Sequence, residues 1–292
     1  MTPDPVLVLA WLTLAHLAAD FVLQTDRIAA DKFASGRPAA RALGLHWAEV
    51  ALCLVPVVLA FGLPGVAFLV LVSGLHAAID RTKVVLTRRA EARAIAEATA
   101  AHESLATAGS LGTAWTPVPA ALFALDQLAH GVVIVGVWAL LLSQATLAGP
   151  FVSGVDAVLG GWDRTLVHRV VLGAVVLIDL GIVNVRAGSL FVATLVSPRA
   201  AVVGEEDPVP ASPARIGATI GVLERLLVVT LVLTGAETAI GLVIAAKTLA
   251  RFRQLDDRHF AEYYLLGTMA SVSVALASGL IGLAALAPLA HP

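Results

Sequence analysis

Residues 65–86 read GVAFLVLVSGLHAAIDRTKVVL. The run is long enough to cross the roughly 30 Å hydrocarbon core of a bilayer, which takes about 20 apolar residues. Its first half carries no charge, whereas its second half brings His76, Asp80 and Lys83. Ionisable residues are rare and costly inside a membrane, and they usually mark a cavity, a partner or a metal. The stretch therefore predicts a transmembrane helix that contributes to a polar site.

The whole 292-residue chain shares this apolar character. Hydrophobic residues make up 59% and charged residues 14%, against roughly 25% charged residues in ordinary soluble domains, and the mean hydropathy is +0.89. A soluble globule could not bury so much apolar surface, so we exclude a soluble enzyme, a disordered protein and a collagen-like fibre. The net charge of −2 excludes nucleic acid as a partner. The single cysteine, Cys53, excludes a disulfide framework and a Cys-based zinc site.

We predict an all-α fold, a polytopic transmembrane helical bundle of about eight spans in a lipid bilayer. The predicted spans are 5–23, 42–62, 65–86, 117–146, 165–187, 215–235, 237–250 and 261–288. The segment 237–250 is short, and a re-entrant or half-crossing helix is the alternative there. Most Lys and Arg residues lie in alternate loops, which marks those loops as cytoplasmic. This bias predicts that both termini are non-cytoplasmic.

Three modules follow from this arrangement. Residues 1–146 are predicted to form a four-span module with the His/Asp motifs, 147–212 the fifth span with its flanking loops, and 213–292 a three-span module. In the longest loop, 87–116, the stretch 88–108 is rich in Ala, Glu and Arg and predicts a surface helix. Residues 147–164 contain Gly-Pro and Gly-Gly pairs and predict a short external loop.

The ionisable residues within the spans fall mainly in the halves nearest the cytoplasm. Three spans each pair an imidazole with a carboxylate four residues away, which places both groups on one helix face. Imidazole nitrogen and carboxylate oxygen are ordinary ligands for zinc and for metals such as manganese, and helical bundles build metal sites from inward side chains on facing helices. We therefore predict a divalent metal, zinc or manganese, as cofactor. The predicted ligands are His16, Asp20, His46, His76, Asp80 and His130.

Three functions remain open for these residues. A metal-dependent hydrolase would act on a lipid-linked or phosphate-containing substrate, with Asp126 as the catalytic general base. A proton or divalent-cation transporter would use the same groups as a relay, although the apolar outer half offers nothing to solvate a moving ion. A metal-free hydrogen-bond network that joins the helices is the alternative to a metal at the His/Asp residues. A non-catalytic scaffold or sensor would bind its partner at loop 87–116 or at the linker near Glu205. The sequence specifies no protein partner for it.

A second set of charged residues lies in the last three spans. Lys247 and Arg251 have the same four-residue spacing. The set predicts either ion pairs between helices or an anion site for phosphate or a lipid headgroup, for which Arg and Lys are suited. Its members are Glu224, Arg225, Lys247, Arg251 and Glu262.

These motifs together resemble a bacterial multi-pass membrane-protein family known only as domain of unknown function three-three-zero-seven. The N-terminal pattern is His16-x-x-x-Asp20-Phe21-x-x-Gln24, Lys32, His46, His76-x-x-x-Asp80-x-x-Lys83 and Asp126-Gln127-x-x-His130. The C-terminal pattern, similar to longer family members, is Gly221-x-Leu223-Glu224-Arg225, Ala246-Lys247-x-x-x-Arg251-Phe252 and Glu262-Tyr263-x-x-x-Gly267-Thr268. The resemblance implies the bacterial cytoplasmic (inner) membrane as location and implies nothing about chemistry.

Overall fold

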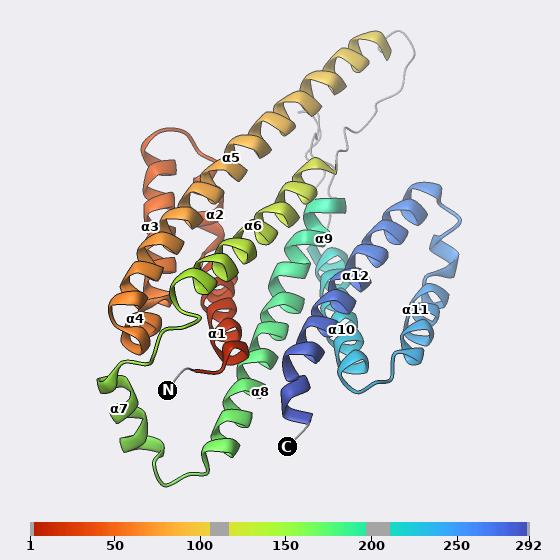
Figure 1. Ribbon diagram of the computed structural model, residues 1–292. Coiled ribbons are helices and arrows are strands. Elements are labelled where there is room, and N and C mark those ends of the chain that lie inside the picture. Colours follow the sequence, from red (N-terminus) through yellow and green to blue (C-terminus); the bar gives the residue numbers. More distant parts are fainter. Residues whose placement is uncertain (1–2, 106–116, 197–210, 291–292) are drawn as a thin grey trace. The chain divides into compact units, whose positions relative to one another are not determined.

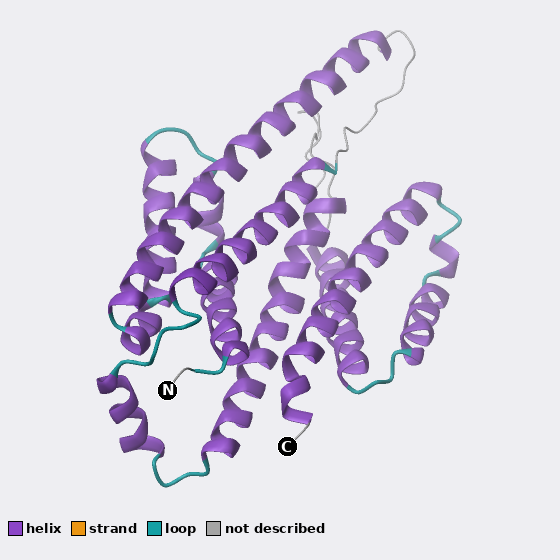
Figure 2. Cartoon of the chain, viewed as in Figure 1, coloured by secondary structure: helices purple, strands orange, loops and turns teal. Residues whose placement is uncertain are grey.

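The computed structural model describes residues 3–105, 117–196 and 211–290, which form helices joined by short loops, with no strand in those ranges (Figures 1 and 2). The first half contains α1 (Pro5–Ala18), η1 (Ala19–Leu23), α2 (Asp26–Lys32), α3 (Arg37–Cys53), α4 (Val55–Phe61), α5 (Leu63–Leu105) and α6 (Val118–Leu141). The second half contains α7 (Gly149–Leu159), α8 (Arg164–Ile182), η2 (Val183–Ala187), α9 (Gly188–Val196), α10 (Ala211–Leu233), α11 (Thr238–Ala250), η3 (Phe252–Gln254) and α12 (Arg258–Ala290). The predicted all-α fold is confirmed.

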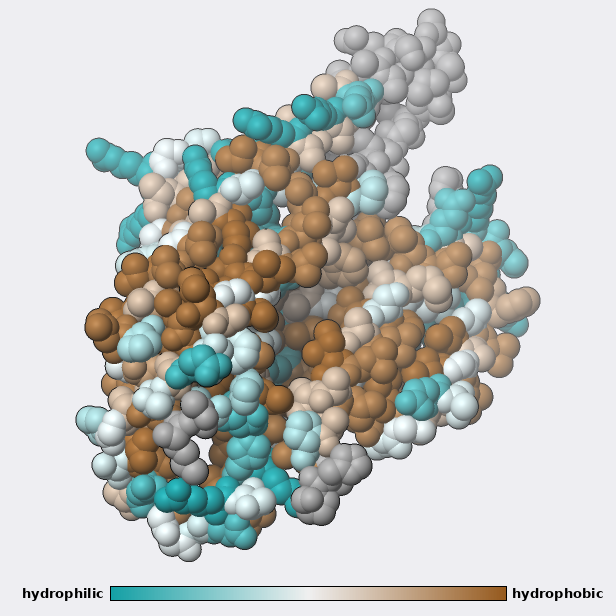
Figure 3. All heavy atoms as spheres, viewed as in Figure 1, coloured by the Kyte–Doolittle hydropathy of each residue, from teal (hydrophilic) through white to brown (hydrophobic). Residues whose placement is uncertain are grey.

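Seven stretches among these residues are long and apolar enough to cross a membrane. They are Pro5–Leu23, Arg37–Phe61, Leu63–Ala94, Val118–Leu141, Arg164–Val196, Ile216–Leu233 and Phe260–Leu289. Figure 3 shows how widely hydrophobic side chains cover the visible surface, and Leu63 and Leu140 are 80% and 76% exposed. Apolar exposure of this extent requires an apolar surrounding, so the chain is a multi-pass membrane protein.

The seventh predicted span, 237–250, corresponds to α11. This helix has only 13 residues, about 20 Å at 1.5 Å per residue, which is less than the roughly 30 Å of hydrocarbon. It is not among the seven stretches. Placing both termini on the non-cytoplasmic side requires α11 to cross, and that orientation stays a prediction.

Two predicted loops contain helix in the structure. Residues 88–105 of the predicted surface helix are helical, but they continue α5 from the third span without a break to Leu105, and residues 106–108 lie outside the described residues. No Gly or Pro interrupts that stretch, so nothing stops the helix where the charged residues begin. The external loop at 147–164 contains α7, which begins near Pro150, a residue suited to the first helical turn.

The chain divides into two compact units. The first comprises Met1–Val84, Leu125–Ile182 and Ala284–Pro292, and the second Val85–Ala124 and Val183–Leu283. In the first unit, α1 packs against α8 and α3, α2 against α3, and α4 against α7. In the second unit, α10 packs against η2, α9 and α11.

The first unit contains an apolar cluster beside its polar residues. On α1 and α5, Leu12 and Phe68 of this cluster precede the histidines, whereas on α3 and α6 the cluster residues follow them. The two helix pairs therefore run in opposite directions and share one apolar layer and one polar layer. The buried members are Leu12, Ala15, Ala19, Val50, Leu54, Val57, Phe61, Phe68, Val72, Ile134, Val137 and Leu142.

A proline and a glycine explain the two turns that flank α4. The second span bends between α3 and α4, where Pro56 cannot supply a backbone N–H to the preceding turn. Gly62 joins α4 to α5 with φ +63°, a conformation that glycine adopts without steric cost. After these turns, Nε2 of His46 on α3 and Nε2 of His76 on α5 lie 3.0 Å apart.

Candidate metal centre

Four helices of the first unit contribute the polar residues. His16 and Asp20 come from α1 and η1, His46 from α3, and His76 from α5. The segment η1 is a π-turn, in which the Gln24 amide bonds the Ala19 carbonyl five residues back, and such insertions are frequent at functional sites. The nearby carboxylate and imidazole side chains are almost fully buried, with exposed fractions of 1–8%. They are Asp20, His46, His76, Asp80, Asp126 and His130.

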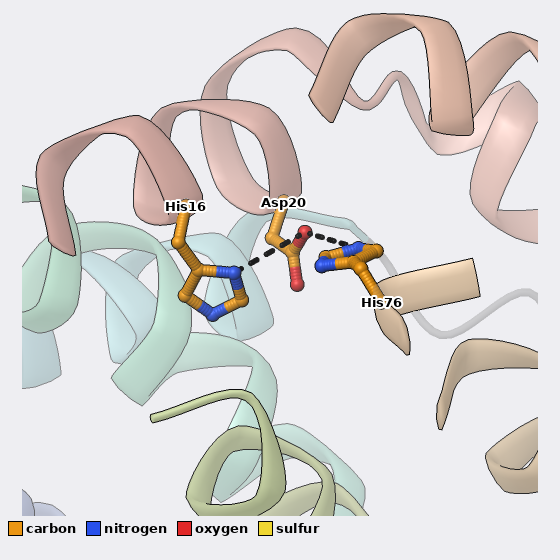
Figure 4. A group of neighbouring side chains, drawn as sticks. All are labelled: His16, Asp20 and His76. Atoms are coloured by element: carbon orange, nitrogen blue, oxygen red, sulfur yellow. Dashed lines mark ion pairs between the residues drawn. The ribbon is translucent and has the colours of Figure 1, made fainter. Parts of the chain in front are cut away.

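Three potential ligand atoms form a close triangle. Nε2 of His46 lies 3.0 Å from Nε2 of His76, and Oδ1 of Asp20 lies 3.2 Å and 3.3 Å from those two nitrogens. Oδ1 of Asp20 receives no hydrogen bond in this arrangement. Figure 4 shows Asp20 between His16 and His76. Ligands bound tetrahedrally to zinc at about 2.0–2.1 Å lie roughly 3.4 Å apart, so the triangle has the dimensions of a metal site.

Asp80 supplies a fourth atom at the same place. Its Oδ2 lies 3.4 Å from Nε2 of His46 and 3.9 Å from Nε2 of His76. The same oxygen accepts a hydrogen bond from Nζ of Lys32 at 2.6 Å, and Lys32 also donates to Oε1 of Gln24 at 2.6 Å. A carboxylate oxygen has two lone pairs, so Asp80 can accept from Lys32 and still face a cation.

Outer hydrogen bonds fix the imidazoles. As a neutral imidazole, His46 donates from Nδ1 to Oε2 of Glu49 at 3.2 Å, because a carboxylate only accepts. Its Nε2 lone pair then faces the carboxylates of Asp20 and Asp80. Metal-bound histidines characteristically donate their other N–H to such an acceptor.

His16 and His130 also each use one ring nitrogen as a hydrogen-bond donor. Nε2 of His16 lies 3.2 Å from Oε1 of Gln127, and Nδ1 of His130 lies 2.8 Å from the carbonyl of Asp126. Each nitrogen is a donor in the neutral ring, so the other nitrogen carries a lone pair. Those two nitrogens, Nδ1 of His16 and Nε2 of His130, are buried and make no hydrogen bond.

A small cavity adjoins three of the imidazoles. It measures about 10 Å³ and is lined by His16, His76 and His130, with apolar side chains completing the wall. This volume is close to the space that one water molecule needs. This cavity therefore has room for about one water molecule.

Asp126, the predicted general base, lies at the edge of the cluster. Its Oδ2 accepts hydrogen bonds from Nζ of Lys83 at 2.7 Å and from Nε2 of Gln127 at 3.0 Å. Its Oδ1 is buried without a hydrogen-bond partner and lies 3.8 Å from Nδ1 of His130. Asp126 therefore connects Lys83 to the histidine cluster.

The sequence-based site omitted several residues that complete this centre. Lys32 lies in a predicted loop, and its approach to Asp80 depends on how α2 folds back against α3. Lys83 and Glu49 follow Asp80 and His46 by three residues, a spacing that puts each pair on one helix face. This three-residue spacing is the sequence feature from which Lys83 and Glu49 could have been predicted to belong to the site.

The C-terminal charged set does not form one cluster. Lys247 pairs with Glu224 at 2.5 Å, Arg251 donates to Gln254, and Glu262 pairs with Arg258 on its own helix rather than with a second helix. Among the described residues, Arg225 forms hydrogen bonds with neutral groups, those of Asn184, Ser189 and Ser271. Of the predicted pairs between helices, Glu224 with Lys247 is present.

Comparisons with known proteins relate the chain to one family. A search of curated proteins found no match, and a search of solved structures also found none. A family model described as "Protein of unknown function (DUF3307)" matches residues 8–153, half of the chain. The matched range contains every residue of the candidate metal centre, from His16 to His130. The chain thus belongs to this family, in agreement with its sequence resemblance.

Proposed function

We propose that this membrane protein binds one divalent cation through Asp20, His46, His76 and Asp80. The observation that carries the proposal is the convergence of two imidazole nitrogens and a carboxylate oxygen within 3.0–3.3 Å. Such atoms repel one another unless a proton or a cation lies among them. The bacterial inner membrane is the location that we propose for this activity.

The charge balance supports a divalent ion. Lys32 pairs with Asp80 and Lys83 with Asp126, whereas Asp20 and Glu49 contact His46. With neutral imidazoles, four carboxylates and two ammonium groups leave two negative charges uncompensated. Uncompensated charge is costly in a membrane interior. One divalent cation would neutralise it. The mixed nitrogen and oxygen ligand set suits zinc and also manganese.

Metal content of the purified protein tests this proposal. We expect about one equivalent of zinc or manganese in the wild type and a loss of most of it in His46→Ala and His76→Ala. His168→Ala is the matched control, because His168 also pairs with an aspartate, Asp4, at 2.9 Å but lies away from the centre. A wild type that stays metal-free after incubation with both ions, or a His76→Ala variant with full occupancy, would overturn the proposal.

Hydrolysis is the second candidate function. It is favoured by the small cavity and by the two buried nitrogens of His16 and His130 that make no hydrogen bond. A divalent cation supplies Lewis acidity that makes a water molecule easier to deprotonate. His16 and His130 can accept protons from water in the cavity, so they are better placed as bases than Asp126, whose Oδ2 is held by Lys83. The proposed substrate is lipid-linked or phosphate-containing.

Phosphate-ester probes test the hydrolytic candidate. We expect zinc- or manganese-loaded protein in lipid vesicles to cleave a nitrophenyl phosphate mono- or diester, and His130→Asn to lose at least tenfold in rate while it keeps its metal. Absence of turnover with both esters and both metals would contradict it. Transport is disfavoured, because the apolar cluster around Phe68 closes one side of the centre.

A further inference from the structure

Gln127 joins the histidine cluster to an ion pair at its edge. Its Oε1 lies 3.2 Å from Nε2 of His16, and its Nε2 donates to Oδ2 of Asp126 at 3.0 Å. The same Oδ2 accepts a hydrogen bond from Nζ of Lys83 at 2.7 Å. These four residues form one hydrogen-bonded chain from α5 through α6 to α1, and all of them lie in the first compact unit.

The ion pair sets the direction of every hydrogen bond in this chain. An ammonium group only donates and an ionised carboxylate only accepts, so the amide of Gln127 must present its NH2 group to Asp126. The other end of the amide, the oxygen Oε1, then faces His16. An amide oxygen only accepts. In a neutral ring, Nε2 of His16 is therefore the nitrogen that carries the proton.

The second ring nitrogen of His16 supports the same assignment. Nδ1 lies 3.9 Å from Oδ1 of Asp20, which is too far for a hydrogen bond between an N–H group and an oxygen. Both atoms are buried, and neither makes a hydrogen bond. An N–H group on Nδ1 would approach this carboxylate to about 2.7–3.2 Å. Nδ1 therefore directs a lone pair, and not a proton, toward Asp20.

The amide of Gln127 disfavours the other neutral form of His16. With the proton on Nδ1, two acceptors would face each other at 3.2 Å, Nε2 of His16 and Oε1 of Gln127. Removing the amide removes this repulsion. Donation from Nδ1 to Asp20 then becomes favourable, because hydrogen bonds to an ionised acceptor are roughly twice as strong as those between neutral groups.

We propose that Gln127 is a positioning residue that keeps His16 in the tautomer with its proton on Nε2 and its lone pair on Nδ1. The ion pair of Lys83 and Asp126 holds the amide, and the amide in turn holds the imidazole. This tautomer leaves Oδ1 of Asp20 free for a cation. That consequence rests on the proposed cation binding, whereas the tautomer itself does not.

Nitrogen-15 NMR of histidine-labelled, metal-free protein in detergent tests the proposal. At alkaline pH the imidazoles are neutral, and the chemical shifts of the two ring nitrogens show which of them carries the proton. The signals of His16 are those that disappear in His16→Phe. We expect wild-type His16 to be protonated on Nε2. Gln127→Met keeps a side chain of similar length without the amide, and it should move the proton to Nδ1.

Two further variants separate positioning from a general loss of structure. Gln127→Glu keeps an acceptor oxygen and should restore protonation on Nε2 of His16. Gln254→Met removes an exposed glutamine of η3, in the second unit, and should leave His16 unchanged. His46 should keep its own tautomer in each of these variants, as expected of a folded centre.

Two results would overturn the role of Gln127. One is a wild-type His16 protonated on Nδ1, and the other is a Gln127→Met variant in which the proton stays on Nε2. The spectra are recorded without metal, so they do not depend on the proposed cation. A protein that binds no metal but shows the expected tautomers would overturn the cation and support the role of Gln127. Metal binding with the opposite tautomer of His16 would do the reverse.

Discussion

Glu49 shows how a single residue outside the ligand set can control the centre. Its carboxylate accepts the Nδ1 proton of His46 and so aims the Nε2 lone pair at Asp20 and His76. Lys32 has the complementary effect, because it holds Asp80 by a short ion pair in which both side chains are at most 7% exposed. The geometry of the candidate metal centre therefore depends on charged residues outside the proposed ligand set.

Replacing Glu49 by glutamine should weaken metal binding by about 10- to 100-fold, the range found for outer hydrogen-bond partners of metal ligands. The amide keeps the size of the side chain but accepts a weaker hydrogen bond from His46. Competition with a chromophoric chelator measures the affinity. Glu237→Gln, at the start of α11, is the control that should bind as the wild type does. Equal affinity of Glu49→Gln and wild type would contradict the role assigned to Glu49.

At the element scale, the π-turn η1 sets the rotation of everything that follows it in the first span. One extra residue in a helix turns the chain by about 100°. After η1, the side chain of Gln24 reaches Lys32, which in turn reaches Asp80. The π-turn therefore positions Gln24 and α2 so that Lys32 can donate a hydrogen bond to the carboxylate of Asp80.

Deleting Val22 should convert η1 to regular α-helix and abolish metal binding, because Gln24 and α2 would rotate away from Asp80. Val22 is 58% exposed, so loss of its side chain alone removes little packing. Metal content after purification is the readout, and membrane insertion should be unchanged. Val22→Ala, which keeps the residue count, should retain the metal. Retention of metal by the deletion variant would show that the π-turn is not required.

At the scale of the whole molecule, the metal centre and Arg225 lie in different compact units. The first unit contains all the proposed ligands, although they come from three separate elements, η1, α3 and α5. A ligand that binds only the folded state stabilises it by about 2.7 kcal/mol at 100 times its dissociation constant. The stabilisation by a bound metal should be confined to the helices around the candidate metal centre.

Removal of the metal by a chelator should therefore accelerate amide hydrogen exchange in α1, α3 and α6 and leave α10 and α12 unchanged. The affected helices surround the centre and would carry uncompensated negative charge without the cation. Hydrogen-exchange mass spectrometry in detergent measures both regions in the same sample. The His76→Ala variant should show the faster exchange with or without chelator. Equal acceleration in α10 would mean that the units do not respond separately.

The sequence by itself determined the membrane class, six of the seven long spans closely, and the three His/Asp pairs. These features are local, because hydropathy and the 3.6-residue period act over one helix. It also identified His46, although nothing local connects His46 to His76. The longest span, Arg164–Val196, extends beyond the predicted 165–187, since apolar residues continue past Arg186.

Only the tertiary structure decided which of these groups meet. The pairing of Lys32 with Asp80, the orientation of His46 by Glu49, and the neutral partners of Arg225 depend on how separate helices are rotated and packed. A π-turn changes that rotation by about 100° without a clear mark in hydropathy or periodicity. Side chains from different helices meet only when those rotations agree, and that agreement is a property of the folded chain.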